Sequence, residues 1–128
     1  MITKKDFYKG RDVQYAGELT NDIRANAEVT MLRASLLLEA FGEEREVTSG
    51  WRPAAVNKAT SHSATHSHHL AGEAVDLEDG DGKLDAWCLT NTSVLEGLGL
   101  WQESPDSTPG WCHVQIVPPK SGHRVFLP

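Results

Sequence analysis

The length and charge of the chain set the first limits on what the protein is. It has 128 residues, of which 39% are hydrophobic, and its 12 Lys and Arg against 18 Asp and Glu give a formal net charge of −6. A chain of this size can bury its own core, so we expect residues 1–128 to form a single domain. The acidic balance argues against nucleic-acid binding, and no apolar run reaches the roughly 18 to 20 residues of a membrane span. The first residues lack the apolar stretch of a signal peptide, so we expect a soluble, cytoplasmically made monomer.

The first half of the chain contains one strong helix pattern. Apolar side chains recur at spacings of three and four from Ile23 to Phe41, which predicts an amphipathic helix that Gly42 ends. A short strand is expected at Glu46–Ser49. The stretch Trp51–Leu70 is rich in Ser, Thr, Ala and His, and we expect a long loop of the kind that usually serves function.

The second half alternates strands and helices. Ala74–Leu77 predicts a compact strand in which alternate side chains face the core and Asp76 points away from it. The acidic DGDG segment Asp79–Gly82 does not fit a calcium-loop pattern and is expected to be a turn and helix cap. A second amphipathic helix is predicted from Lys83 to Gly97.

Further strands are predicted toward the end of the chain. Gly97–Gln102 is a strand candidate, Cys112–Val117 predicts a strand with His113 and Gln115 on one face, and Arg124–Leu127 predicts a last strand. Together the elements predict an α+β fold in which helices flank an antiparallel sheet.

Three residues in these elements have the chemistry of a metal site. His69 lies at the end of the expected loop, Asp76 on the next strand and His113 on a later one, and both residue types bind zinc. Three such ligands leave one position for water, whose pKa zinc lowers to about 7, as hydrolysis requires. The spacing alone leaves open the alternative that they are ordinary surface or core residues.

Three ordered motifs relate these residues to a known family. The string SHHLAGEAVD at Ser67–Asp76 fits Ser-x-His-x-x-Gly-x-Ala-x-Asp, SGWRP precedes it and WCHVQ follows it. Over Val47–Gln115 the chain resembles the zinc D-Ala-D-Ala peptidases, which are grouped with lysostaphin-type enzymes and the hedgehog signalling domain. The resemblance implies a small α+β domain of that kind, in which His69, Asp76 and His113 hold one catalytic zinc ion.

The same resemblance implies a peptidase that hydrolyses amide bonds in the stem peptides of bacterial peptidoglycan. D-Ala-D-Ala carboxypeptidase and L-alanyl-D-glutamate endopeptidase activities both fit. Compact domains of this type resemble phage endolysins, which implies an enzyme that waits in the cytoplasm of a bacterial host and acts on the cell wall after release, or one carried on a virion. The alternative is a zinc-binding phage structural or interaction module without catalytic activity.

Four neighbouring residues have expected roles beside the metal. By resemblance, Arg52 binds a substrate carboxylate or the developing oxyanion, and Ser67 lies near the substrate. Gln115 shares a face with His113 and is expected to hydrogen-bond the substrate or a ligand ring. Trp111 is expected to line the substrate groove. A surface arginine and a solvent-facing serine are the alternatives for the first two.

The catalytic base is where the chain departs from the family pattern. Many relatives have Glu or Asp three residues before the last histidine, where this chain has Gly110. A peptidase still needs a carboxylate that takes a proton from water and passes it to the leaving amine. We expect Glu103 in this role, because hedgehog domains resemble this chain in a Glu-Ser pair ahead of the last ligand. Asp106 is the alternative.

The remaining histidines are expected to decorate the loop. His62, His66, His68 and His123 are interpreted as loop residues rather than a second metal site, and the motif register selects His69 rather than the adjacent His68 as the ligand.

The tryptophans and cysteines have simpler expectations. Trp51 and Trp101 either line the groove or pack in the core, and Trp87 lies on the apolar stripe of its helix. Cys88 and Cys112 have no CxxC spacing and are expected to be buried thiols.

Overall fold

The structure is a computed structural model that describes residues 1–60 and 66–128, so the expectation for His62 lies outside the described residues. The helices are α1 (Lys4–Tyr8), α2 (Arg11–Gln14), α3 (Asn21–Phe41), α4 (Ala54–Ala59), α5 (Lys83–Thr90) and α6 (Thr92–Leu98), with short 3-10 helices η1 (Ala16–Glu18), η2 (His68–Ala71) and η3 (Pro105–Ser107). The strands are β1 (Val47–Ser49), β2 (Ala74–Glu78), β3 (Trp101–Glu103), β4 (Trp111–Gln115) and β5 (Val125–Phe126).

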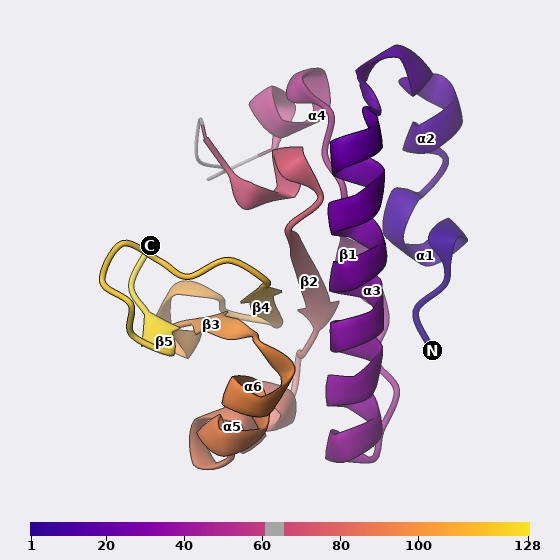
Figure 1. Cartoon of the computed structure of the whole chain (residues 1–128). Helices are drawn as coiled ribbons and strands as arrows, with labels where there is room; N and C mark the ends of the chain where they lie inside the picture. Colours follow the sequence, from indigo (N-terminus) through magenta and orange to yellow (C-terminus); the bar gives the residue numbers. More distant parts are fainter. Residues whose placement is uncertain (61–65) are drawn as a thin grey trace.

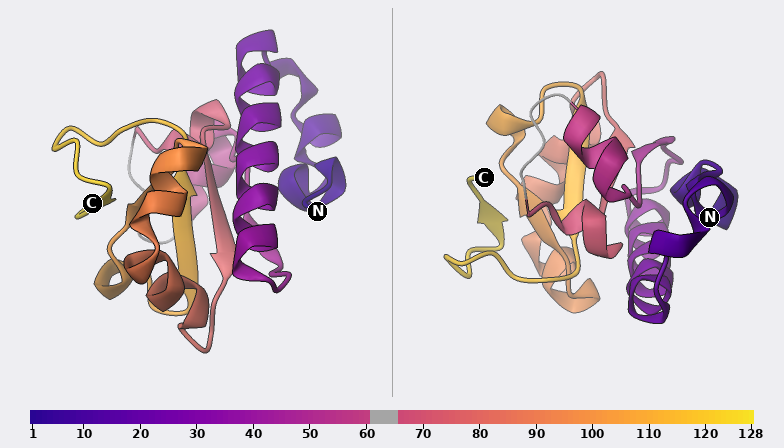
Figure 2. Two further views of the ribbon diagram at one scale, coloured as in Figure 1. Left: turned by 60° about the horizontal axis from the view of Figure 1, so that its bottom comes forward. Right: turned by 90° about the horizontal axis from the view of Figure 1, so that it is seen from above.

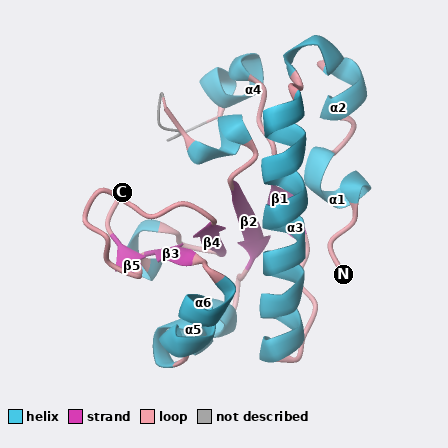
Figure 3. Ribbon diagram, in the orientation of Figure 1, coloured by secondary structure: helices cyan, strands magenta, loops and turns pink. Residues whose placement is uncertain are grey.

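One mixed sheet organises the fold. Within the described residues it has five strands in the order β1-β2-β4-β3-β5 (Figures 1 and 3). This confirms the expected small α+β fold, but one pair differs from the expected antiparallel arrangement, because β5 runs parallel to β3. Both edges of β4 are already taken by β2 and β3. The chain turns back after β4 and joins beyond β3, where it runs parallel to that strand.

The apolar core lies between the sheet and its helices. Figure 2 shows α3 alongside β2, with α1 on the outer side of α3. Alternate residues of the two central strands face this core, and the remaining residues of those strands face the opposite side. The core-facing residues of β2 and β4 are Val75, Leu77, Cys112 and Val114, and Cys88 joins them from α5. Cys88 and Cys112 are buried free thiols, as expected.

The helix predicted in the first half is confirmed as α3. It begins at Asn21, where the Thr20 hydroxyl oxygen accepts a hydrogen bond from the N–H of Ile23 at 3.2 Å, and Gly42, at φ +90°, ends it. No helix in the described part of the chain is long and apolar enough to span a membrane.

Two predicted elements are wrong in detail. The expected loop Trp51–Leu70 contains α4, which begins directly after Pro53, and also the start of η2. The helix expected over Lys83–Gly97 is two helices that meet at Asn91 (φ −130°). The Asn91 amide donates to the carbonyl of Trp87 at 2.8 Å, and this local hydrogen bond competes with continuation of the helix.

Two further segments differ from the sequence predictions. No element is expected before Ile23, yet α1 and α2 lie there, and α1 begins with a capping box between Thr3 and Asp6. The strand candidate Gly97–Gln102 is divided, because α6 continues to Leu98 and β3 begins only at Trp101.

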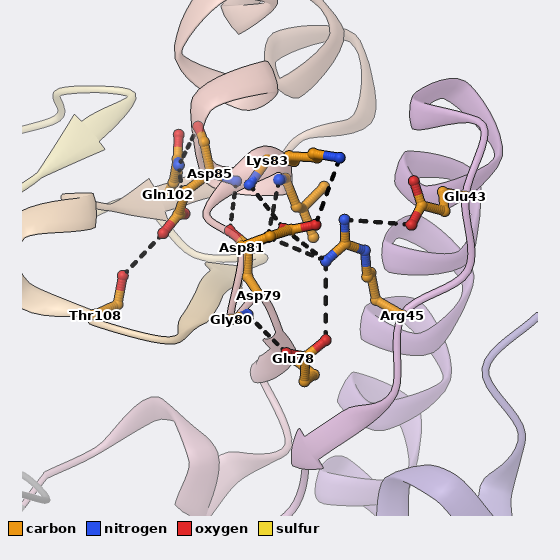
Figure 4. Close-up of polar contacts among 11 residues, drawn as sticks. Glu43, Arg45, Glu78, Asp79, Gly80, Asp81, Lys83, Asp85, Gln102 and Thr108 are labelled. Carbon is orange, nitrogen blue, oxygen red and sulfur yellow. Dashed lines mark hydrogen bonds and ion pairs between the residues drawn. The ribbon is translucent and has the colours of Figure 1, made fainter.

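The acidic DGDG segment is a turn and helix cap, as expected. The carboxylate of Asp79 accepts hydrogen bonds from the N–H groups of Leu84 and Asp85, each at 2.9 Å, and so holds the start of α5 (Figure 4). Arg45 lies against the same turn, with its guanidinium 3.3 Å from Asp79 and 3.2 Å from Asp81. Its charge compensates the buried Asp79 carboxylate.

Gly50 tests how closely the N-terminal helix α1 packs, and Gly97 serves as the control. A Cβ on Gly50 would overlap the backbone carbonyl of the fully buried Phe7, whereas a Cβ on Gly97, in α6, would meet nothing within 4 Å. We expect Gly50→Ala to lower the free energy of unfolding by about 1–3 kcal/mol. Gly97→Ala should raise it by about 0.5–1 kcal/mol. Urea unfolding measures both, and an unaltered Gly50→Ala variant would contradict the close approach of Phe7.

Candidate functional site

Three elements that are distant in the sequence bring His69, Asp76 and His113 together. They lie on η2, β2 and β4, and Asp76 pairs directly with His113 across β2 and β4, on the face opposite the core. The η2 turn folds over this face because the N–H of Arg52 donates to the carbonyl of His69 at 3.0 Å. The Ser67 hydroxyl oxygen accepts from the N–H of His69 at 3.2 Å and caps the same turn.

The Asp76 carboxylate lies between the two imidazoles. One oxygen, Oδ2, is 3.3 Å from Nε2 of His69, and the other, Oδ1, is 2.8 Å from Nδ1 of His113. All three candidate ligand atoms lie within 4.8 Å of one another. His69 and Asp76 are buried, and His113 is partly buried.

Hydrogen bonds on the outer side of each ring determine which nitrogen carries the proton and which one presents a lone pair to the carboxylate. Nδ1 of His69 is 2.8 Å from the carbonyl oxygen of Gly50, which only accepts, so Nδ1 carries the proton and Nε2 presents a lone pair in the neutral ring. The Gln115 amide donates to the carbonyl of Val117 at 2.9 Å, so its oxygen faces Nε2 of His113, also at 2.9 Å. The neutral ring of His113 therefore presents the lone pair of Nδ1.

This donor set fits a metal cation. Nε2 of His69 is buried and has no hydrogen-bond partner among the described residues. Two imidazole lone pairs and a carboxylate converge on one point, and such a mixed nitrogen and oxygen set suits zinc. Outer hydrogen bonds from histidine to a carbonyl or amide oxygen are those that orient metal-binding imidazoles. The residues present therefore meet the requirements of the predicted ion.

The protonation equilibria of the three side chains reflect the same geometry. Burial alone raises the pKa of Asp76, but the charge of His69 and the hydrogen bond from His113 outweigh it and lower that pKa below its ordinary value. Burial lowers the pKa of His69, which favours the neutral, metal-binding ring. Burial also lowers the pKa of His113, but its hydrogen bond to Asp76 outweighs this and raises it.

The three residues line a cleft of about 600 Å³, which we call the His-Asp cleft. The expected site residues Arg52, Ser67, Glu103, Trp111 and Gln115 also line it. Thus the tertiary structure brings together the residues that the motifs indicated, although they are spread over half of the sequence.

Arg52 is a buried part of the cleft, and the surface alternative is wrong for it. Its side chain is 8% exposed, one terminal nitrogen donates to the side-chain oxygen of Asn57 at 3.3 Å, and the other lies 3.6 Å from Oδ2 of Asp76. Its Nε is buried without a hydrogen-bond partner among the described residues. This fixed guanidinium is suited to binding an anionic group that enters the cleft.

Glu103, not Asp106, is placed to act on a molecule in the cleft. Glu103 ends β3 and lines the cleft, whereas Asp106 in η3 is exposed and does not line it. Burial raises the pKa of Glu103, the positive charge of His113 lowers it, and the net shift is upward. The structure thus supplies a half-buried carboxyl group on the same side of the molecule as the three candidate ligands.

The tryptophans divide between the cleft and the core. Trp111 lines the cleft as expected. Trp51 is 1% exposed and packs in the core, where its indole N–H donates to the backbone carbonyl of Leu70 at 3.0 Å. Trp101 lies under the guanidinium of Arg124, 4.4 Å from the ring centre. Trp87 packs at the edge of the core.

The neighbouring histidines line the cleft without forming a second cluster. His66 and His68 are on its lining, and Nδ1 of His68 is 3.1 Å from Glu73. Within residues 1–60 and 66–128, the only group of side chains arranged to hold a metal ion is the one built on His69, Asp76 and His113.

Two parts of the site were not expected from the sequence. The Gly50 carbonyl that orients His69 is a backbone group, which a residue pattern does not reveal, although Gly50 lies in the SGWRP motif. Phe126 on β5 lines the cleft and packs edge-on against His113, with ring centres 6.3 Å apart. Its place depends on the parallel pairing of β5, which sequence periodicity does not indicate.

Gln115 tests the importance of the outer hydrogen bonds. Gln115→Leu removes the acceptor of His113 Nε2, so we expect metal affinity to fall about 10- to 100-fold. Zinc competition against a chromophoric chelator measures this, and Gln14→Leu, on the exposed end of α2, is the matched control. Equal zinc affinity for the two variants would contradict the orienting role of Gln115.

Comparison with known proteins agrees with the site. A search of curated proteins finds no match. A family model described as Peptidase M15 matches residues 11–104, which include Arg52, His69, Asp76 and Glu103 and end before His113. Because this match spans well over half of the sequence, the chain belongs to the Peptidase M15 family.

Proposed function

We propose that this protein is a zinc-dependent peptidase that hydrolyses amide bonds in the stem peptides of bacterial peptidoglycan. The observation that carries the proposal is the convergence of His69, Asp76 and His113 in a cleft that also holds a buried arginine and a half-buried glutamate. Membership of the Peptidase M15 family supports amide hydrolysis as the reaction. The peptidoglycan substrate is supported by the motif resemblance.

His69, Asp76 and His113 would hold the ion. A bound zinc ion supplies Lewis acidity, which lowers the pKa of water to about 7 and polarises a carbonyl group. The chain's own contribution is to fix the two imidazole rings, through the Gly50 carbonyl and the Gln115 amide, so that the donor atoms are in place before binding.

Glu103 would move the protons of the reaction. A carboxylate in this position takes a proton from the attacking water and delivers it to the nitrogen of the leaving amine. The raised pKa of Glu103 brings its two protonation states closer in free energy near neutral pH, as a group that both accepts and donates requires. Glu103 therefore replaces the carboxylate that relatives have where this chain has Gly110.

Arg52 would bind a carboxylate of the substrate. Stem peptides carry carboxylates beside both candidate bonds, at the terminal D-Ala and on D-Glu. Arg52 lines the cleft and is held there by Asn57 and Asp76, so little reorganisation is needed for its guanidinium to meet an anion. Trp111 and Phe126 provide apolar lining for the methyl groups of alanine residues.

Zinc content and peptide cleavage can be measured on one sample. We expect one zinc per chain by elemental analysis, and new amino groups when the protein is incubated with purified peptidoglycan. His69→Ala should lose both, because it removes a ligand, whereas the exposed His123→Ala should lose neither. Mass spectrometry then distinguishes release of free D-Ala from exposure of a new amino-terminal glutamate.

One bound zinc without new amino groups would contradict the enzyme and favour the zinc-binding structural or interaction module. Retention of both zinc and activity by His69→Ala would contradict the assigned ligand set.

Glu103→Gln should separate catalysis from metal binding. The variant retains the shape of the side chain but cannot take a proton, so we expect kcat to fall about 100- to 10,000-fold while zinc content stays unchanged. Asp106→Asn, a few residues further along and exposed, is the matched control and should keep the normal rate. The reverse result, a slow Asp106→Asn and a normal Glu103→Gln, would move the base to Asp106.

A further inference from the structure

Asp85 is a buried acidic residue outside the His-Asp cleft. It lies on α5, is 5% exposed, and both of its carboxylate oxygens accept hydrogen bonds from other segments. Gln102 Nε2 donates to Oδ1 at 2.8 Å, and the Thr108 hydroxyl donates to Oδ2 at 3.2 Å (Figure 4). Gln102 Nε2 also approaches the backbone carbonyl of Asp85 at 3.2 Å.

The two partners of Asp85 lie on either side of the segment that carries Glu103. Gln102 directly precedes Glu103 on β3. Thr108 lies between Ser107 and Pro109, which both line the cleft. One carboxylate therefore holds both ends of residues 102–108, the stretch in which the chain leaves the sheet and forms the wall of the cleft.

The backbone of this stretch needs such an anchor. Only Trp101–Glu103 is strand, and the following segment has a short 3-10 helix and two prolines. The N–H of Thr108 donates to the nearby carbonyl of Pro105 at 3.1 Å. The N–H of Ser104 donates to the carbonyl of Phe126, on the short strand β5, at 2.7 Å. The side-chain bonds to Asp85 tie the stretch to a helix that packs in the core.

Burying a carboxylate is unfavourable for folding unless hydrogen bonds compensate for the lost water. Burial raises the pKa of Asp85, and hydrogen bonds from Gln102, Cys112 and Thr108 offset only part of the rise. An apolar side chain would avoid this cost but would not set the position of β3 and the cleft wall. The buried Asp85 carboxylate is therefore explained better by the position that it gives to β3 and the cleft wall than by a gain in folding stability.

We propose that Asp85 is a positioning residue that holds Glu103 and the cleft wall around Thr108 in place through paired hydrogen bonds to Gln102 and Thr108. The proposal rests on the proposed function, because it assigns Asp85 an effect on the rate through Glu103. Asp85 itself touches neither the candidate metal ligands nor the cleft.

Two Asp85 variants separate hydrogen-bond geometry from charge. Asp85→Asn keeps an oxygen for Gln102, and its amide nitrogen can donate to the Thr108 hydroxyl, which also accepts. Asp85→Ala keeps neither bond. We expect Asp85→Ala to retain zinc but lose about 100-fold in kcat, because a small displacement of a catalytic group has an effect of that size. Asp85→Asn should stay within about threefold of the normal kcat.

Thr108→Val provides a milder test, because it leaves the Asp85 carboxylate and its hydrogen bond from Gln102 in place. It removes one of the two hydrogen bonds with little change of shape, and we expect about a 10-fold loss of kcat. Thr90→Val removes a hydroxyl from the exposed end of the same α5 helix and is the matched control. Loss of rate in Thr108→Val with a normal Thr90→Val would support the proposal even if Asp85→Ala did not fold.

A double variant identifies the route of the effect. If Asp85 acts through Glu103, adding Asp85→Ala to Glu103→Gln should reduce kcat no further. A further full loss in the double variant would overturn the proposal, as would a normal kcat in Asp85→Ala or an equal loss in Asp85→Asn. A normal rate in Glu103→Gln alone would instead show that the proposed role of Glu103 has failed.

Hydrogen exchange gives a readout that does not depend on activity. We expect the amides of Ser104 and Thr108 to exchange faster in Asp85→Ala and Thr108→Val than in the unsubstituted protein, with no change in α3. Unaltered exchange at both amides would overturn the anchoring role of Asp85, whether or not the protein hydrolyses peptidoglycan.

Discussion

The buried carboxylate of Asp76 is the constraint on which the site depends. A carboxylate with 9% exposure must be compensated by charges or donors, because its lost hydration is otherwise too unfavourable. The guanidinium of Arg52 and the protonated ring of His113 provide that compensation, or a cation held by Asp76 and the two imidazoles would do so, and these groups come from the segment before α4, from β4 and from η2. The fold must therefore hold these segments against β2, and the direct pairing of Asp76 with His113 fixes the register in which it does so.

The SGWRP motif shows how successive residues of one short segment serve both the core and the cleft. Gly50 approaches Phe7 so closely that no side chain fits, and its carbonyl orients His69. Trp51 points into the core, where it packs edge-on to Tyr8 with ring centres 6.1 Å apart. Arg52 then points into the cleft. Packing of the N-terminal helix and placement of the candidate ligand His69 are thereby coupled through one backbone position.

The two sides of the cleft are held in place by different interactions. The candidate ligands Asp76 and His113 lie on the central strands, which pack on the core and are paired along their length. Glu103 and the wall beyond it lie where the sheet ends, on a segment held by side-chain bonds and by the short strand β5. A rigid side suits metal ligands, whose geometry must be set closely, and a looped side is where relatives of one fold can vary in substrate preference.

The sequence by itself indicated the candidate site residues and the local form of the strongest elements. The spacing of apolar residues was sufficient for α3, strand alternation placed Asp76 on the face opposite the core, and the ordered motifs identified the residues that meet in the cleft. Only the tertiary structure placed Glu103 on the cleft and Asp106 outside its lining, and paired β5 in parallel with β3. Periodicity records which face of an element is apolar, whereas these outcomes depend on which sheet edge is free and which residue reaches the cleft.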